Sequence, residues 1–150
     1  MTDVLGRDLL ATYRVTDGRH EDVDLATERR TVRAATVLDA GTAGGVDNAV
    51  QAVIHRIKTA DGELAELGHA DYGSRHHRLI GEPNTEGNRN LVKLYVLRAL
   101  ALEPRIEKVL AAEIVADLQR DRVTISLTLR FTGVAQPQDL VVPFNLGGPA

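Results

Sequence analysis

Four histidines, the residues best suited to bind a transition metal, lie between positions 55 and 77. They are His55, His69, His76 and His77. Zinc sites place imidazoles at helical or loop spacings that converge on one point. The adjacent His76 and His77 project differently, and no carboxylate lies at a matching spacing. We therefore expect surface or hydrogen-bonded histidines in a turn, and no metal ion.

Carboxylates are also frequent in this part of the chain, and a glycosidase needs two of them to flank the bond it cleaves. These residues stand among glycines and arginines without a distinctive pattern: Glu63, Glu66, Asp71, Glu82 and Glu86. Aromatic residues make up only 3% of the sequence, whereas sugar sites usually rely on aromatic walls. The sequence thus predicts no catalytic residue, although a small cell-wall glycan hydrolase stays open as an alternative.

Other catalytic and cofactor motifs are absent from the sequence. Gly73-Ser74-Arg75 lacks the second glycine of a nucleophile elbow. Gly41-Thr42-Ala43-Gly44-Gly45 lacks the Gly-Lys-Ser/Thr ending of a phosphate loop, and we interpret it as a flexible hinge. With no cysteine in the chain, thiolate chemistry is excluded as well. We expect no enzymatic activity and no cofactor.

Length and charge exclude several classes of partner. A chain of 150 residues is long enough for one domain with a real core. The net charge of −3 does not favour a nucleic acid or an anionic membrane as partner. No apolar run approaches the roughly 20 residues of a membrane helix, and the N-terminus lacks a signal-peptide profile. We expect the protein to stay in the cytoplasm unless it leaves within a larger assembly.

The spacing of apolar residues predicts two helices. A stripe from Val46 to Ile57 has the period of a helix with one buried face, with Asp47 as its cap and Gln51, Arg56 and Lys58 on the wet side. The segment from Leu91 to Leu102 carries charge only at Lys93 and Arg98, so we expect it to be packed on more than one side. Pro104 ends this second helix.

The C-terminal third predicts strands. Val123 to Phe131 alternates apolar and polar residues, which is typical of a strand with one buried face. Residues 119–122 look like a hairpin turn whose first arm lies within 112–118, although 106–118 could also be helical. Residues 139–146 form a last short strand, and Pro143 places it at a sheet edge.

The N-terminal part is less regular. Residues 13–16 and 31–38 could be short strands, separated by a polar turn at 17–22. We divide the chain into a segment 1–44, with possible strands or an arm, and a domain 45–150. Leu79-Ile80 should tuck into the core. The expected fold class is α+β, with two helices packed on a small, mainly antiparallel sheet that has an exposed edge strand.

Glu103-Pro104-Arg105 has two readings. It is either a helix stop flanked by two charges, or a buried or interfacial Glu–Arg pair held rigid by proline. The residues alone leave both open.

Several motifs, in their order and spacing over residues 45–146, resemble the baseplate wedge and sheath-initiator family of contractile tails, the GPW-like baseplate proteins. This family occurs in myophages, tail-like bacteriocins and extracellular contractile injection systems, with relatives in type VI secretion. The motifs are the Asp47–Lys58 helix followed by Gly62-Glu63-Leu64, Tyr72-Gly73-Ser74-Arg75 with Leu79-Ile80-Gly81, Glu103-Pro104-Arg105-Ile106, and Leu140-Val141-Val142-Pro143-Phe144.

The resemblance implies a protein that works by assembly. Glu103, Pro104 and Arg105 would anchor it to other wedge proteins, and Tyr72, Gly73 and Arg75 would form a second contact loop. The protein would stand in six copies around the tube and hub, in the baseplate of a tail-like particle. Arms of the first sheath ring would add to the edges of its sheet. The implied sheath-contacting residues are Thr124, Ser126, Thr128, Arg130, Leu140, Val141, Val142 and Phe144.

The sequence departs from the expected pattern at His76-His77, where we expect an apolar or aromatic neighbour of Arg75. Residues 1–40 match the family only loosely. A generic α+β adaptor outside any tail is a further alternative.

Overall fold

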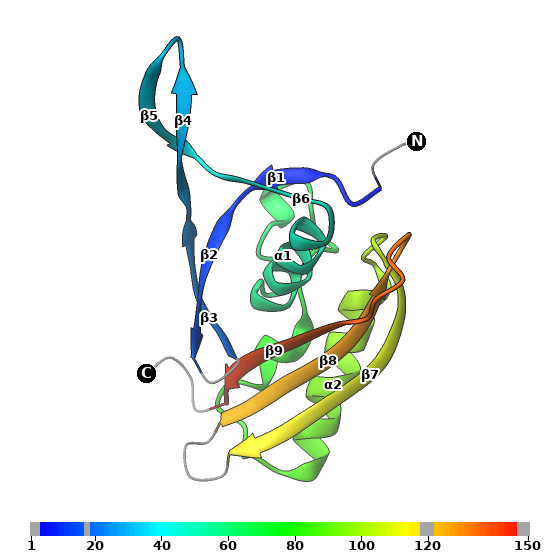
Figure 1. Ribbon diagram of the computed structural model, residues 1–150. Coiled ribbons are helices and arrows are strands. Elements are labelled where there is room, and N and C mark those ends of the chain that lie inside the picture. Colours follow the sequence, from blue (N-terminus) through cyan, green and yellow to red (C-terminus); the bar gives the residue numbers. More distant parts are fainter. Residues whose placement is uncertain (1–3, 17–18, 118–121, 147–150) are drawn as a thin grey trace.

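The computed structural model describes residues 4–16, 19–117 and 122–146. It has the α+β fold expected from the sequence (Figure 1). The elements are β1 (Arg7–Leu9), β2 (Ala11–Thr16), β3 (Arg19–Leu25), β4 (Thr27–Val32), β5 (Ala35–Ala40), β6 (Thr42–Gly44), α1 (Gly45–Lys58), η1 (Ala65–Leu67), η2 (Arg75–Leu79), α2 (Glu86–Ala101), β7 (Ile106–Asp117), β8 (Arg122–Phe131) and β9 (Gln138–Asn145).

The main sheet has the order β7-β8-β9 and is antiparallel throughout. Its register sets Ile125 of β8 between Ile114 of β7 and Val142 of β9. The expected first arm of the hairpin is a strand, but it begins at Ile106 and not within 112–118, and residue 118 lies outside the described residues. The helical alternative for 106–118 is wrong, because β7 pairs with β8 from Ile106 to Asp117. The edge position of β9 is also confirmed. Residues 119–121 of the expected turn lie outside the described residues, and Arg122 already belongs to β8.

One hydrophobic core lies between the sheet and the two helices. The alternate residues of β8 are buried in it, as the period of two predicts. Helix α1 contributes Val53 and Ile54, and α2 contributes Val96 and Leu100. Leu79 joins this core as expected, but Ile80 is exposed. No described helix is long and apolar enough to cross a membrane.

Both helices begin differently from the sequence prediction. The N-cap of α1 is Gly44, with no side-chain cap, so Asp47 lies in the first turn and is not the cap. Helix α2 starts at Glu86, because the Thr85 side chain accepts a hydrogen bond from the backbone N–H of Asn88 and caps it. The expectation that α2 packs on more than one side is wrong within this chain, since its outer face is exposed.

The N-terminal region contains more strands than the sequence predicted. Strands β2 and β3 form one hairpin, β4 and β5 another, and β1 pairs with β6. Residues 19–22, expected in a turn, belong to β3. The expected hinge at 41–45 is also wrong: Thr42–Gly44 is β6, and the Gly41 N–H donates to Ala26 O at 2.9 Å.

Figure 1 shows the β4–β5 hairpin projecting away from the rest of the molecule, whereas β1 and β6 lie against α1. Leu5, which precedes β1, belongs to the same core cluster as the helices and the main sheet. The division of the chain at residue 44 stays a prediction.

Candidate interface site

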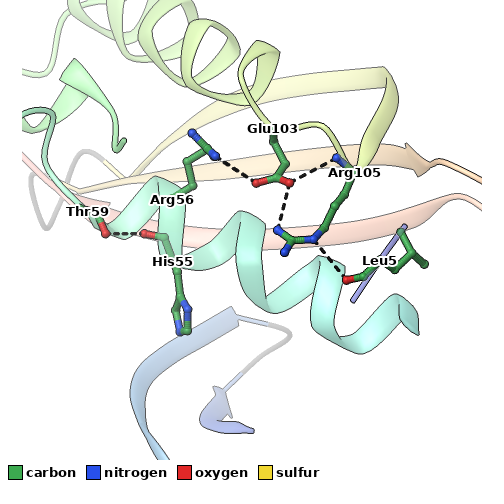
Figure 2. Close-up of polar contacts among 6 residues, drawn as sticks. All are labelled: Leu5, His55, Arg56, Thr59, Glu103 and Arg105. Atoms are coloured by element: carbon green, nitrogen blue, oxygen red, sulfur yellow. Dashed lines mark hydrogen bonds and ion pairs between the residues drawn. The ribbon is translucent and has the colours of Figure 1, made fainter. Parts of the chain in front are cut away.

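Glu103 is the buried centre of the candidate site, and both of its carboxylate oxygens are occupied. Oε2 accepts hydrogen bonds from Nε and Nη2 of Arg56, each at 3.2 Å (Figure 2). Oε1 accepts from Nη1 of Arg105 at 3.1 Å and from its backbone N–H at 3.3 Å. Because Glu103 is only 4% exposed, two guanidiniums rather than water compensate its charge. The sequence left two readings of Glu103 and Arg105. The structure shows that they form a pair, and that the buried Glu103 carboxylate bonds only to residues of this chain among those described.

A turn over residues 103–106 gives this pair its geometry. The Ile106 N–H donates to Glu103 O at 3.2 Å, and Pro104 takes the second position of the turn, where its fixed φ is favoured. Pro104 is exposed and has no N–H that needs a partner. The turn links the end of α2 to the start of β7, and it brings Arg105 within hydrogen-bond distance of the Glu103 carboxylate.

Arg56 extends the site from Glu103 to the 72–75 loop. Its guanidinium carbon lies 4.6 Å from the centre of the Tyr72 ring, a cation–π contact. The side chain comes from α1 and is only 8% exposed, so its predicted place on the wet side is wrong. Tyr72, Glu103 and Arg105 were predicted as parts of two separate contacts, and Arg56 joins them into one cluster.

The N-terminal segment covers the polar face of α1. The Gln51 side chain accepts from Ala11 N at 2.8 Å and donates to Leu9 O at 2.7 Å, so its predicted exposure is wrong too. Asn48 Nδ2 donates to Leu5 O at 2.7 Å. The sequence contained a signal for this burial. Asn48 and Gln51 lie one helical turn apart, and a side-chain amide can both donate to and accept from backbone groups, which a charged side chain cannot do.

Arg105 ties the same segment to the site. Its Nε donates to Leu5 O at 3.2 Å (Figure 2). Its backbone carbonyl accepts from Thr132 N at 2.9 Å, beyond the end of β8. Arg105 therefore links the N-terminal segment and the sheet to Glu103, while part of its side chain stays exposed.

The 72–75 loop is held against the turn after α1. Ser74 N donates to Thr59 O at 2.9 Å, and Asp61 N donates to Ser74 O at 3.2 Å. Gly73 has a φ of +99°, and a Cβ there would lie 2.5 Å from Ala60 O. Glycine is thus required by a close backbone approach, which gives Gly73 a structural role in placing Tyr72. Arg75, the third predicted loop residue, is exposed and pairs with Asp61 at 3.5 Å.

Two hollows flank the exposed side chain of Leu102. One, of about 340 Å³, is lined by Arg56, His69, Asp71 and Tyr72. The other, of about 390 Å³, lies between the 70–75 loop and α2. Burial raises the pKa of the Tyr72 hydroxyl, although Arg56 opposes the shift, so the phenol is protonated at neutral pH. Hydrogen-bond donors and an aromatic ring thus line the first hollow.

The adjacent histidines have structural contacts. His76 is buried, bonds Ser74 Oγ through Nδ1 at 2.7 Å, and meets the Phe144 ring edge-on at 4.5 Å. His77 Nε2 donates to Ile57 O at 2.8 Å. Burial, with a smaller contribution from His77, lowers the pKa of His76 to about 3. His76 therefore stands as a neutral core residue where we expected an apolar neighbour of Arg75, and it is not a surface histidine.

The predicted sheath-contacting residues lie in the centre and at one edge of the sheet. Thr124, Ser126, Thr128 and Arg130 belong to β8, whose backbone is paired on both sides, so an added strand cannot reach it. Three predicted contacts in β9 are buried in the core of this chain: Leu140, Val142 and Phe144. Val141 is half-buried on the other face.

The described residues contain no group of three or more histidines or carboxylates that could hold a metal ion. The features of the described surface are the free edge of a sheet, the turn with Glu103 and Arg105, and the two hollows beside Leu102.

No protein-family model matches this sequence, and no curated protein matches it. Among solved structures, the fold is similar to the crystal structure of a candidate tail lysozyme from Geobacter sulfurreducens. The TM-score is 0.58 at 24% identity, and the match covers 67% of this chain and 90% of that chain. At this identity the similarity establishes a shared fold.

Proposed function

We propose that this protein is a structural baseplate component of a contractile injection system or phage tail. In this role it joins the baseplate wedge to the first sheath ring and nucleates the sheath by strand addition. The fold that it shares with a candidate tail lysozyme favours a tail protein over an unrelated adaptor. It would be assembled in the cytoplasm and stand in six copies in the baseplate ring, next to the tube and hub proteins.

The observation that carries this proposal is the outer edge of β7. Among the described residues no strand pairs with this edge, whereas β3 lies beside β9 at the opposite edge (Figure 1). Register shifts interrupt the first half of β7, but from Ala111 to Asp117 it is regular. A regular, unpaired edge offers backbone donors and acceptors to an incoming extended arm. The sheath arm would therefore join at β7, and the outer face of β8 would meet it only through side chains.

The wedge contact would use the Glu-Pro-Arg turn indirectly. Glu103 is fully engaged inside the chain, so it fixes the turn and does not face a partner. Pro104 is exposed and Arg105 partly so, and these two residues would meet the wedge protein, with Tyr72 and Arg75 presented by the neighbouring loop.

Strand addition can be tested with two neighbouring proline variants, Ala112→Pro and Glu113→Pro. Adjacent residues of an edge strand direct their N–H groups to opposite sides. One variant therefore removes a bond to β8, and the other removes only a donor at the free edge. The variant that keeps wild-type stability in urea is the one that lacks only the donor at the free edge. We expect wild-type protein to shorten the lag of sheath polymerisation, measured by light scattering, and the stable proline variant to lose this effect. Equal nucleation by both proteins would contradict strand addition at β7.

A cell-wall glycan hydrolase is the second candidate, because Asp61 and Asp71 both line the larger hollow. However, Asp61 is held by Arg78, at 3.1 Å from Nε and 2.7 Å from Nη2, and by Arg75. Release of reducing sugar from peptidoglycan, abolished by Asp71→Asn, would favour this candidate. No release would leave the structural role.

A further inference from the structure

Helix α2 presents to solvent an apolar stripe with an arginine in its middle. Leu91, Leu94 and Leu102 are 37%, 43% and 57% exposed. With 3.6 residues per turn, these leucines and Arg98 project within an arc of about 80°. We call these four residues the α2 outer face.

Core packing does not explain this face. Val92, Val96 and Leu100 point into the core, and the three leucines project to the other side. Single exposed leucines are common, but a contiguous exposed apolar patch marks an interaction site. The nearly all-apolar composition of α2 predicted packing on a second side. We therefore infer that the three leucines pack against another protein.

The larger hollow extends the α2 outer face sideways. Its volume is about 390 Å³; on the helix side it is lined by Tyr95, Arg98 and Leu102, and on the loop side by Asp71 and Arg75. An elongated partner lying along α2 would cover the leucines and fill this hollow at the same time. From Leu91 to Leu102 the face is about three helical turns, or ~16 Å, long.

Charge selects the kind of partner. Arg98 makes no hydrogen bond or ion pair with any residue that the structure describes, whereas Arg75 at the rim of the hollow is paired with Asp61 at 3.5 Å. Two copies of this chain facing each other along α2 would bring Arg98 against its own counterpart. Like charges at an interface are repulsive, whereas a carboxylate between the leucines would be attracted.

We propose that an acidic, amphipathic helix of another baseplate protein packs on the α2 outer face, with a carboxylate paired to Arg98. A helix fits because leucines at these spacings form a ridge that a second helix accommodates between its own side chains. Arginine within an apolar patch is also typical of residues that dominate interface energies. This inference rests on the proposed function and adds to it a surface and the chemistry of its partner.

Burial of the face is tested by cysteine labelling, since the chain has no cysteine of its own. Leu94→Cys is reacted with a maleimide in purified particles, in the isolated protein and in denatured particles. We expect labelling in intact particles to be at least about tenfold slower than in the isolated protein. Equal rates would overturn the inference while leaving the baseplate role in place. Absence of the protein from particles would overturn the proposed function itself.

The partner's charge is tested by variants of the same helix. Arg98→Glu should lower incorporation into particles at least about tenfold, whereas Arg98→Lys should retain it. Lys93→Glu is the matched control, because Lys93 is exposed on the other flank of α2 and should incorporate normally. A photo-crosslinker at position 94 should join an acidic helical segment of another protein. Crosslinks to a second copy or to a basic segment, or normal incorporation of Arg98→Glu, would contradict the inference.

Discussion

Glu103 Oε2 accepts two hydrogen bonds from Arg56, whose Nε and Nη2 atoms each lie 3.2 Å away. Arg56 belongs to α1, and Glu103 lies in the turn that follows α2, 47 positions away. Through this pair and Arg105, two helices, the start of β7 and the N-terminal segment share one carboxylate. The turn that we propose as the wedge contact is thus held by hydrogen bonds within the chain.

Removal of the Arg56 guanidinium should destabilise the protein strongly. Arg56→Ala leaves the Glu103 carboxylate with one guanidinium at a buried position, and breaking a buried pair costs about 3–5 kcal/mol. Urea unfolding of the variant and the wild type measures this loss of unfolding free energy. Arg78→Ala, which removes one of the two arginine partners of Asp61 on the surface, is the control and should cost less than about 1 kcal/mol. Equal, small losses in both would show that Glu103 does not depend on Arg56.

Alanine at position 73 should be more disruptive than alanine at another glycine with positive φ. Gly73→Ala combines left-handed backbone strain with a Cβ 2.5 Å from Ala60 O, whereas at Gly68 (φ +85°) nothing lies within 4 Å of the added Cβ. The strain alone costs about 1 kcal/mol or more. We expect Gly73→Ala to exceed Gly68→Ala in lost unfolding free energy. A Gly73→Ala loss no larger than that of Gly68→Ala would contradict the close approach.

Stability should fall on acidification because of His76. Its folded-state pKa, lowered by burial to about 3, lies below the ordinary 6.5, so the unfolded chain binds a proton that the folded chain does not. This contribution is complete above about pH 6.5 and is lost towards pH 3, by at most ~1.4 kcal/mol per pH unit.

Urea unfolding of wild-type protein and His76→Gln at pH 7 and pH 5 measures this dependence. The variant cannot take up the proton and should lose less stability between the two pH values. The same pH dependence in both proteins would refute the assignment to His76.

Local sequence patterns predicted the helix and the strand whose buried residues recur at a regular period. The stripe from Val46 to Ile57 became the buried face of α1, and the alternation from Val123 to Phe131 became the central strand β8. These predictions worked because one side of each element faces the core, and a period of 3.6 or 2 is visible without knowledge of the partner.

Long-range polar contacts were not predictable in this way. Arg56 and Gln51 looked solvent-exposed because their partners, Glu103 and the Leu9–Ala11 backbone, lie 40 or more positions away. The sequence singled out Glu103, Arg105 and Tyr72 but did not predict that Arg56 contacts both Glu103 and Tyr72, since nothing local brings Arg56 to them. The sequence left open whether His76 is a surface or a hydrogen-bonded histidine, because its ring partner Phe144 comes from β9.

Deletion of the gene in its native locus, followed by electron microscopy of the particles, tests the central claim most directly. We expect sheathed particles to disappear while free sheath protein is still expressed. The intact gene should restore them, and Arg105→Ala should fail to do so even where the variant protein is folded and abundant. Normal contractile particles in the deletion strain would contradict the baseplate assignment.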